Sequence, residues 1–284
     1  MPTRRSLTLG LLASACVTPE PDARTGWPLW RIERGGGLVW LTGEIPPRRN
    51  DWQDSNIQSV AAGCDVIWTE TNRMVRGNMR DLIALHGLEA SPLRQRLSPE
   101  DYGLVEKAAV LAKLPLTSVS SLRPWLVAQQ LDDAFFPATG LTGRTLQAVI
   151  TDAARAANKQ VESEFAAQDD VVAWLGSFTP SQNLQYLRYT LDQVLAPPAD
   201  ETVKFEAFSR GDLALAAKWV TRMREVYPDL HRAMVVDRNR AWLPRIESAL
   251  ASHQPTLVIT GLYHLVTPEG IPAQLSTAFP VHRV

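Results

Sequence analysis

Two short apolar runs near opposite ends of the chain, each ending at a glycine, constrain the fold more than any other feature. The first is LVWLTG, which ends at Gly43, and the second is TLVITG, which ends at Gly261. Short runs rich in β-branched, aliphatic and aromatic residues that stop at a glycine are typical of buried strands. The sequence therefore predicts strands over residues 38–42 and 256–260, each followed by a turn.

A similar arrangement follows each of these two runs. After the first come a predicted helix over residues 51–62 and the strand DVIWTE at residues 65–70; after the second come PEGIPAQLSTA and the strand PVHRV. Strand–helix–strand units favour parallel pairing of their strands. We interpret the two units as a degenerate internal repeat and predict that strands 38–42, 65–70 and 256–260 are neighbours in one sheet.

The middle of the chain is predicted to be helical. Ser98 before Pro99 and Thr179 before Pro180 are typical of helix starts. Further helical patterns begin at Pro124, Leu146, Asp212 and Pro228, and NKQVES is a candidate short strand. Pro244 is expected to kink or split the last of these helices because its ring removes a backbone hydrogen bond.

No linker marks a domain boundary in the chain. The prediction is therefore a single α/β (α+β) domain over residues 27–284. Its central sheet is built from the two terminal strand–helix–strand units, and the large helical middle region packs over that sheet.

The first residues are typical of an export signal. MPTRRS supplies two arginines, the apolar run LTLGLLASA is too short to span a bilayer, and Ala15 is followed by Cys16. We predict a signal peptide over residues 1–15 and a polar tether over residues 16–26. Cleavage after Ala15 would leave a soluble periplasmic protein, whereas lipidation of Cys16 would leave a membrane-anchored lipoprotein of a bacterial envelope. The arginine pair also resembles a twin-arginine signal, and a frayed N-terminus of a cytosolic protein is the remaining alternative.

Composition and cysteine content narrow the class of partner. The net charge is -1 at pH 7 and 45% of the residues are hydrophobic, which is ordinary for a globular protein and argues against nucleic acid. Membrane contact is expected only through a lipid on Cys16. The other cysteine, Cys64, lies beside an apolar strand, which predicts a buried and inert thiol; a Cys16–Cys64 disulfide is the alternative.

Three ionisable residues follow the predicted strands closely. His264 stands three residues after Gly261, Glu70 ends the strand 65–70, and Glu44 follows the first glycine directly. Ligands in open α/β sheets bind beyond the carboxyl ends of the strands. We therefore predict that Glu70 and His264 face one pocket at that edge. Glu44 could face the site or point away, and the structural alternatives are a histidine that bonds a loop and an acid that caps a helix.

The remaining polar candidates carry a weaker signal. Arg238 and Asn239 are adjacent on a predicted helix, so we expect one to point inward while the other pairs elsewhere. The other four histidines have no metal-ligand spacing and are assigned to the surface: His86, His231, His253 and His282. Neither a glycine-rich phosphate loop nor a G-x-S-x-G motif is present.

Four segments together resemble the TraB/GumN family, in the order and rough spacing of that family. They are LVWLTGEIPP, AAGCDVIWTETN, DRNRAWLPRI and TLVITGLYHLVTPEGIPAQL, and the resemblance covers nearly all of the chain after the predicted signal. The family also includes eukaryotic Wnt-cleaving proteases and looks related to erythromycin-esterase-like proteins. In it, both terminal strands end in G-x-x-H, and an acidic residue ends the strand after the first.

The resemblance implies roles for several residues of this chain. Gly261 and His264 match the second G-x-x-H motif, and Glu70 matches the acid. Arg238 and Asn239 match the family's RN pair.

The resemblance fails at one position of the first motif. Gly43 matches its glycine, but Pro46 stands where the family has a histidine. A further family glutamate, in the middle of the chain, falls near VESEF, where Glu164 is the nearest candidate.

The resemblance and the missing histidine leave two functions open. Metal-dependent hydrolysis needs about three protein ligands, and proline cannot replace imidazole. His264, Glu70 and either Glu44 or Glu164 could still form a carboxylate-rich site, which would favour manganese over zinc, or they could bind no metal. A nearby carboxylate is expected to favour the protonated form of His264.

In the first, the protein is an exported metal-dependent hydrolase, peptidase- or esterase-like, that acts on a small molecule or peptide. In the second, the protein is a catalytically inactive family member that serves as a binding or envelope-maintenance lipoprotein.

Overall fold

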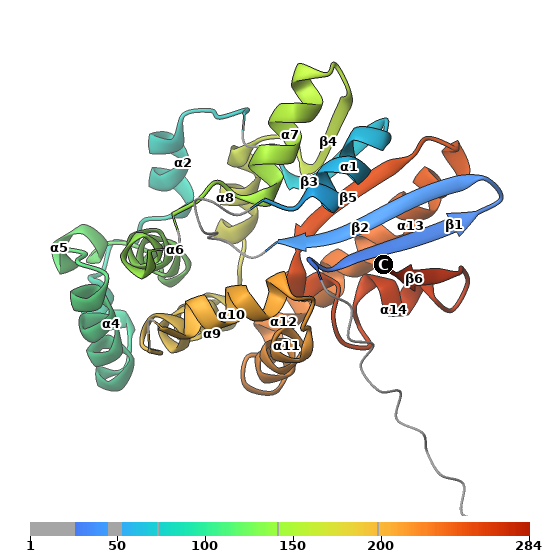
Figure 1. The fold of residues 1–284 in the computed structure, drawn as a ribbon. Coiled ribbons are helices and arrows are strands. Elements are labelled where there is room, and N and C mark those ends of the chain that lie inside the picture. The colour runs from blue at the N-terminus through green and yellow to red at the C-terminus, as the bar shows by residue number, and fades with distance from the viewer. Residues whose placement is uncertain (1–25, 45–52, 73, 141, 198) are drawn as a thin grey trace, which may run out of the picture.

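The computed structural model describes residues 26–44, 53–72, 74–140, 142–197 and 199–284 (Figure 1). The predicted signal peptide, most of the predicted tether, Cys16 and Pro46 lie outside these ranges. The lipidation of Cys16 and the loss of the first-motif histidine at Pro46 therefore stay predictions.

The described residues form one six-stranded sheet with the strand order β4–β3–β5–β2–β1–β6. Its strands are β1 (Leu29–Arg34), β2 (Gly37–Glu44), β3 (Val66–Thr71), β4 (Gln160–Phe165), β5 (Thr256–Gly261) and β6 (Val281–Arg283). β5 pairs in parallel with both β2 and β3, and β3 pairs in parallel with β4. The prediction that the three apolar strands are neighbours is confirmed, with β5 inserted between the two strands of the first unit.

Strand β1 has no counterpart in the sequence prediction. It forms an antiparallel hairpin with β2, and β6 pairs with its other edge. Gly35 and Gly36 make the turn with φ angles of 53° and 96°, values that favour glycine. A glycine pair between two apolar runs is a hairpin signal, so this strand was predictable.

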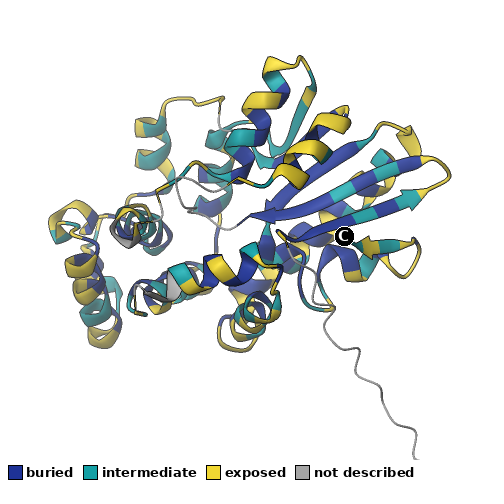
Figure 2. Cartoon of the chain, in the orientation of Figure 1, coloured by how far each residue is buried: buried dark blue, intermediate teal, exposed yellow. Residues whose placement is uncertain are grey.

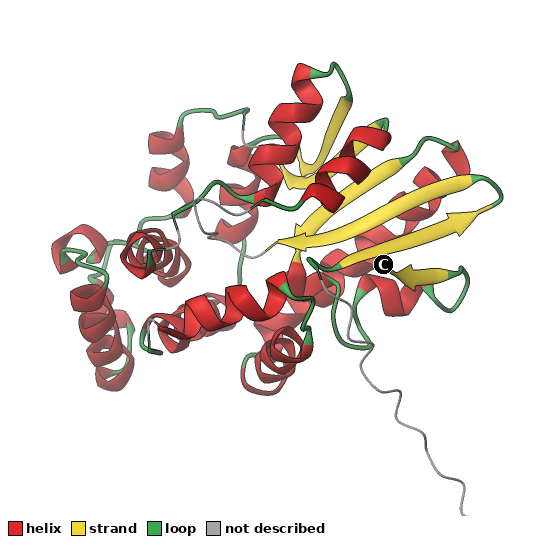
Figure 3. Cartoon of the chain, in the orientation of Figure 1, coloured by secondary structure: helices red, strands yellow, loops and turns green. Residues whose placement is uncertain are grey.

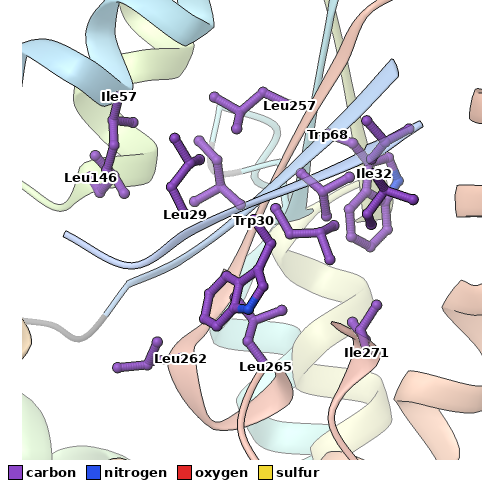
Figure 4. Close-up of a cluster of buried hydrophobic side chains, with 14 of the residues drawn as sticks. Leu29, Trp30, Ile32, Ile57, Trp68, Leu146, Leu257, Leu262, Leu265 and Ile271 are labelled. Atoms are coloured by element: carbon purple, nitrogen blue, oxygen red, sulfur yellow. The ribbon is translucent and has the colours of Figure 1, made fainter. Parts of the chain in front are cut away.

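Helices cover both faces of the sheet (Figure 1). Helices α1 (Ser55–Gly63) and α7 (Leu146–Ala156) lie on one face, and α13 (Asp237–Ser252) and α14 (Ile271–Leu275) lie on the other. Figure 4 shows Ile57 and Leu146 on one side of the strands and Leu265 and Ile271 on the other. Burial on both faces explains why the parallel strands are continuous apolar runs rather than alternating ones.

Most of the helical middle packs beside the sheet rather than over it, which corrects the prediction. Its apolar side chains form a second core, separate from the one around the sheet. Helices α4 (Pro99–Leu111), α6 (Pro124–Phe135) and α9 (Pro180–Val194) belong to it and begin at the predicted prolines. Both faces of the sheet are already covered, so these helices bury their apolar sides against one another. They lie beyond the carboxyl ends of the parallel strands (Figure 3).

The junction between the two cores lies at that carboxyl edge. Tyr263 packs against apolar residues of both cores, and buried segments continue from the sheet into the helical region (Figure 2). A residue at this junction is surrounded by protein on several sides. Side chains that reach the carboxyl edge are therefore partly shielded from water.

The remaining helical segments connect these parts. They are α2 (Met79–His86), α3 (Leu93–Arg96), α5 (Leu116–Val119), η1 (Phe136–Thr139), α8 (Gln168–Gly176), α10 (Ala199–Ser209), α11 (Ala214–Val226), α12 (Pro228–His231), η2 (Arg232–Val236) and η3 (Leu262–His264). Pro244 does not split its helix, because α13 runs unbroken to Ser252; the irregular turn is η2, a π-helical segment before it. Within the ranges that the structure describes, helices that are both long and apolar enough to cross a membrane do not occur.

Cys64 is a buried thiol, as the sequence predicts. Its side chain is in the core around the sheet, and burial raises its pKa to about 12. Such a thiol stays protonated and unreactive near neutral pH.

Candidate functional site at the carboxyl edge of the sheet

The four parallel strands bring ionisable residues to one edge. Glu44 is the last residue of β2, Glu70 and Glu164 are the next-to-last residues of β3 and β4, and His264 ends the η3 turn that follows β5. The β3–β4 register sets Glu70 beside Glu164. Because all four strands run in the same direction, their carboxyl ends meet at this edge.

Close packing of the η3 turn explains the glycine at each strand end. A Cβ atom on Gly43 would lie 2.7 Å from the Cα atom of Leu262. A Cβ atom on Gly261 would lie 2.5 Å from the ring of Tyr263. Any side chain at either position would push away the turn that carries His264.

The guanidinium of Arg238 lies at the centre of the site. Its Nη2 donates to Oε2 of Glu70 at 2.7 Å and to Oε2 of Glu164 at 2.5 Å. Its Nη1 lies 3.3 Å from Nε2 of His264. The Arg238 side chain is only 7% exposed, and the two carboxylates are 18% and 20% exposed, so these ion pairs are largely removed from water. A guanidinium with its fixed fork of donors suits this bridging role.

Asn239 fixes the orientation and tautomer of His264. Its Nδ2 donates to the backbone carbonyls of His264 at 3.3 Å and Glu269 at 2.8 Å. Its Oδ1 is therefore the atom that faces Nδ1 of His264, at 2.7 Å. An amide oxygen only accepts, so Nδ1 carries the proton and the lone pair of Nε2 faces Arg238.

Both members of the RN pair therefore contact His264, which corrects the expectation that only one would point inward. Successive residues on a helix diverge by about 100°. The imidazole lies between the two directions, so Arg238 reaches one ring nitrogen and Asn239 the other. The π-helical turn η2 ends directly before this helix begins, and such turns are frequent at functional sites.

Glu70 is held ionised in the site. Burial alone would raise its pKa, but Arg238, His264 and the backbone N–H of Gly261 outweigh that effect and lower the pKa to about 2. Burial likewise opposes the charge on Arg238, and Glu70 and Glu164 outweigh it, so the pKa of Arg238 is raised. The Arg238 guanidinium and the Glu70 carboxylate therefore carry their charges together.

His264 is neutral, which corrects the prediction of a protonated imidazole. Burial lowers its pKa, the Glu70 carboxylate raises it, and Arg238 lowers it again, with a net value of about 3. The side chain is 0% exposed. Nε2 is 3.8 Å from Oε1 of Glu70, but the guanidinium already balances that carboxylate. The proximity of an acid therefore does not charge this histidine.

Two aromatic residues that sequence reasoning missed enclose His264. The imidazole centroid lies 4.4 Å from the ring of Trp242 and 4.5 Å from the ring of Tyr263. Trp242 also lies 4.7 Å from the guanidinium carbon of Arg238, within cation–π distance. Trp242 follows Arg238 by four residues, and this i, i+4 spacing could have identified it.

A cavity of about 310 Å³ opens onto the Arg238–Glu164 pair. Trp174, Phe178 and Asp237 also line it. Trp174 lies 5.2 Å from the guanidinium carbon of Arg238. A ligand in this cavity would contact aromatic rings and the ion pair, whereas His264 lies behind them.

The described residues do not fit a divalent metal. Glu70, Glu164 and His264 are the donor types that manganese or zinc uses, but all three face the guanidinium of Arg238. Within the described ranges, three such side chains nowhere group in an arrangement that could hold a metal ion. The guanidinium of Arg238 occupies the position between these side chains that a metal ion would need.

The structure also shows where Glu44 and His231 lie. Glu44 is 8% exposed, and its Oε2 accepts a 2.8 Å hydrogen bond from the backbone N–H of Gln147, near the start of α7. This carboxylate stabilises a helix N-terminus. His231, expected at the surface, is 4% exposed, and burial lowers its pKa.

Comparison with known proteins gave a match to one protein family. The sequence profile of the TraB/PrgY/gumN family matches residues 28–278. No curated protein and no solved structure gave a significant match. The match covers strands β1 to β5 of the sheet, the helices as far as α14, Gly43, Gly261, Arg238, Asn239 and His264, and of the sheet it leaves out only the edge strand β6. On this basis the chain belongs to the TraB/PrgY/gumN family.

Proposed function

We propose that this chain is an exported, non-catalytic member of its family that binds a peptide or small molecule at the carboxyl edge of the sheet. The observation that carries the proposal is the position of Arg238. Its guanidinium engages Glu70 and Glu164 and lies against the lone pair of His264 Nε2. The donors that a metal-dependent hydrolase would use therefore face a cation of the protein itself.

The protonation states also favour binding over catalysis. General acid–base catalysis works best when the pKa of the catalytic group is near the working pH. Glu70 and His264 have pKa values of about 2 and about 3, so neither exchanges protons readily near neutral pH. The resemblance adds weight, because it implies a histidine at the position where this sequence has Pro46.

The cavity beside Arg238 is the surface that we assign to the ligand. Trp174 and Phe178 offer aromatic faces, and Asp237, Glu164 and Arg238 offer charged groups. Such a mixture suits a ligand with an apolar body and a polar end.

The proposal predicts that divalent metal neither stabilises nor activates the purified protein. Millimolar Mn²⁺ or Zn²⁺ should leave the melting temperature unchanged, and peptide and ester substrates should not be hydrolysed above background. A compound from a dipeptide and small-molecule screen that raises the melting temperature should lose this effect in Trp174→Ala. Metal-stimulated hydrolysis that disappears in both His264→Ala and Glu70→Gln would contradict the proposal.

A metal-dependent hydrolase is the second candidate, and the tautomer of His264 favours it. Nδ1 donates to Asn239, which leaves the Nε2 lone pair directed into the site. Metal-binding histidines use the same second hydrogen bond to fix the ring. This function requires that Arg238 leave its place between Glu70 and Glu164.

We also propose that the chain is exported and anchored in a bacterial envelope through Cys16. The two arginines, the short apolar run and the Ala15-Cys16 junction support this. Changing Cys16 to serine should move the protein from the membrane fraction to the soluble fraction. Cys64→Ser is the matched control and should leave the fractionation unchanged, because Cys64 is buried. A soluble wild-type protein whose mass includes Met1 would exclude anchoring.

A further inference from the structure

We propose a second ligand site, for a small uncharged aromatic molecule with an acceptor oxygen, in the cavity between helix α13 and the first halves of strands β3 and β5. The cavity measures about 290 Å³. This volume is close to the lower end of the range for small-molecule sites, so it suits a compound of one or two rings. Among the described residues, none lines both this cavity and the one beside Arg238. The site does not depend on the function proposed for the carboxyl edge.

The walls of the cavity come from one face of the sheet and one side of a helix. Val66 and Trp68 on β3 pair with Thr256 and Val258 on β5, and alternate residues of a strand share one face. The lining side chains of α13 recur at steps of three and four residues, which sets them on one side of that helix. They include Trp242, Arg245, Ile246, Ala249 and Ser252. Regular elements therefore hold the cavity in shape.

Two aromatic side chains of the lining carry hydrogen-bond donors without acceptors. Trp68 and Trp242 are 4% and 3% exposed, and neither indole N–H has a partner among the described residues. Buried donors are nearly always paired, and an unpaired one destabilises the folded protein. The two rings pack edge to face with centroids 5.1 Å apart. Both nitrogen atoms are themselves buried, so an acceptor oxygen of the ligand pairs with one of them after that ring turns toward the cavity.

The charges in the lining favour an uncharged ligand. Of the described residues, Glu162 and Arg245 are the ionisable members of the lining, and they pair with each other at 2.7 Å. A charged ligand would have to break this pair or bring its own charge into the cavity unpaired. Ser248 and Gln254 are exposed, and their side chains form no hydrogen bond with the described residues. They offer neutral polar groups to the outer end of the ligand.

The test follows the indole N–H signals of the full chain by NMR during titration with benzamide and 2-naphthamide, which are uncharged and carry a carbonyl oxygen. The signals of Trp68 and Trp242 are assigned from the Trp68→Phe and Trp242→Phe variants. At least one of these two signals should shift until it saturates. The signal of Trp174, which lines the other cavity, should not move. Benzoate has the shape of benzamide but carries a charge, and it should bind about tenfold more weakly or less.

Two substitutions test the position of the ligand. Ala249→Leu adds atoms inside the cavity and should weaken binding by about tenfold or more. Ala251→Leu is the matched control, because Ala251 is exposed on the same helix and is not part of the lining. Trp68→Phe keeps an aromatic ring but removes the donor, so it should weaken binding by about threefold to tenfold. It keeps the proposal testable if Ala249→Leu does not fold.

Three results would overturn the proposal. The first is that neither amide moves the signal of Trp68 or Trp242 at millimolar concentration. The second is that benzoate binds as tightly as benzamide, and the third is that the Ala249 and Ala251 variants bind alike. A shift of the Trp174 signal alone would place the probe in the cavity beside Arg238, which would overturn this site and support the function proposed there.

Discussion

Replacing Arg238 with methionine should lower the free energy of unfolding by about 3–5 kcal/mol. Methionine keeps much of the apolar stem but removes the charge that Glu70 and Glu164 share. Two carboxylates that are mostly buried and adjacent would then face each other without a cation. The loss is measured by urea unfolding of the wild type and the variant at neutral pH, compared through the midpoint and the slope.

Arg245→Met is the matched control for this change. Arg245 lies on the same helix and pairs with Glu162 at 2.7 Å, but its side chain is 45% exposed and that of its partner 38%. An exposed ion pair contributes at most about 1 kcal/mol, so this variant should stay close to the wild type. Equal losses in the two variants would show that burial of the Arg238 cluster has no energetic consequence.

The Arg238→Met variant also tests whether the site can bind a divalent cation. Removing the guanidinium leaves Glu70, Glu164 and the lone pair of His264 Nε2 around an emptied position. Millimolar Mn²⁺ should therefore raise the melting temperature of Arg238→Met while leaving the wild type unchanged. If Mn²⁺ stabilises the wild type as much as the variant, Arg238 does not stand in for a cation, and the hydrolase function gains.

The carboxyl-edge site was predictable to the extent that strand topology fixes it. Buried strands that run in parallel must end at the same edge, and this rule alone brings Glu70 to His264. The rule says nothing of what else reaches that edge. Trp242 and Tyr263 come from packing between two cores, and the sequence does not reveal where those cores meet.

The errors of the sequence prediction have physical causes of the same kind. Helical periodicity shows which side of a helix is apolar, but not whether a sheet or another helix covers it. The prediction therefore set α4, α6 and α9 over the sheet. The charge of His264 was predicted from its nearest acid, whereas burial and Arg238 decide it. Burial is a property of the tertiary structure, which is why a correct list of neighbours gave the wrong protonation state.

Acid should destabilise this protein well above the pH at which its carboxylates titrate. The pKa of His264 is about 3 in the folded protein against an ordinary value of 6.5, because burial disfavours its charged form. Between these values the unfolded chain binds a proton that the folded protein does not, so stability falls as the pH is lowered. From pH 6.5 to 4.5 this group alone should remove about 2 kcal/mol.

A second loss should begin near pH 4.5. There Glu70, whose pKa is lowered from 4.5 to about 2 mainly by Arg238 acting against burial, starts to favour the unfolded chain in the same way. The measurement is a series of urea unfolding curves from pH 7 to pH 4.

His264→Gln isolates the first of these two losses. Glutamine keeps a donor and an acceptor but does not titrate, so the variant should be less stable at pH 7 and lose less stability between pH 6.5 and 4.5. His231 also has a pKa lowered by burial, and His231→Gln is the control that measures its share. An unchanged pH dependence in His264→Gln would mean that His264 is not neutral in the folded protein. In that case the assignment of its Nε2 lone pair to Arg238 would fail with it, because a protonated imidazole has no lone pair to offer.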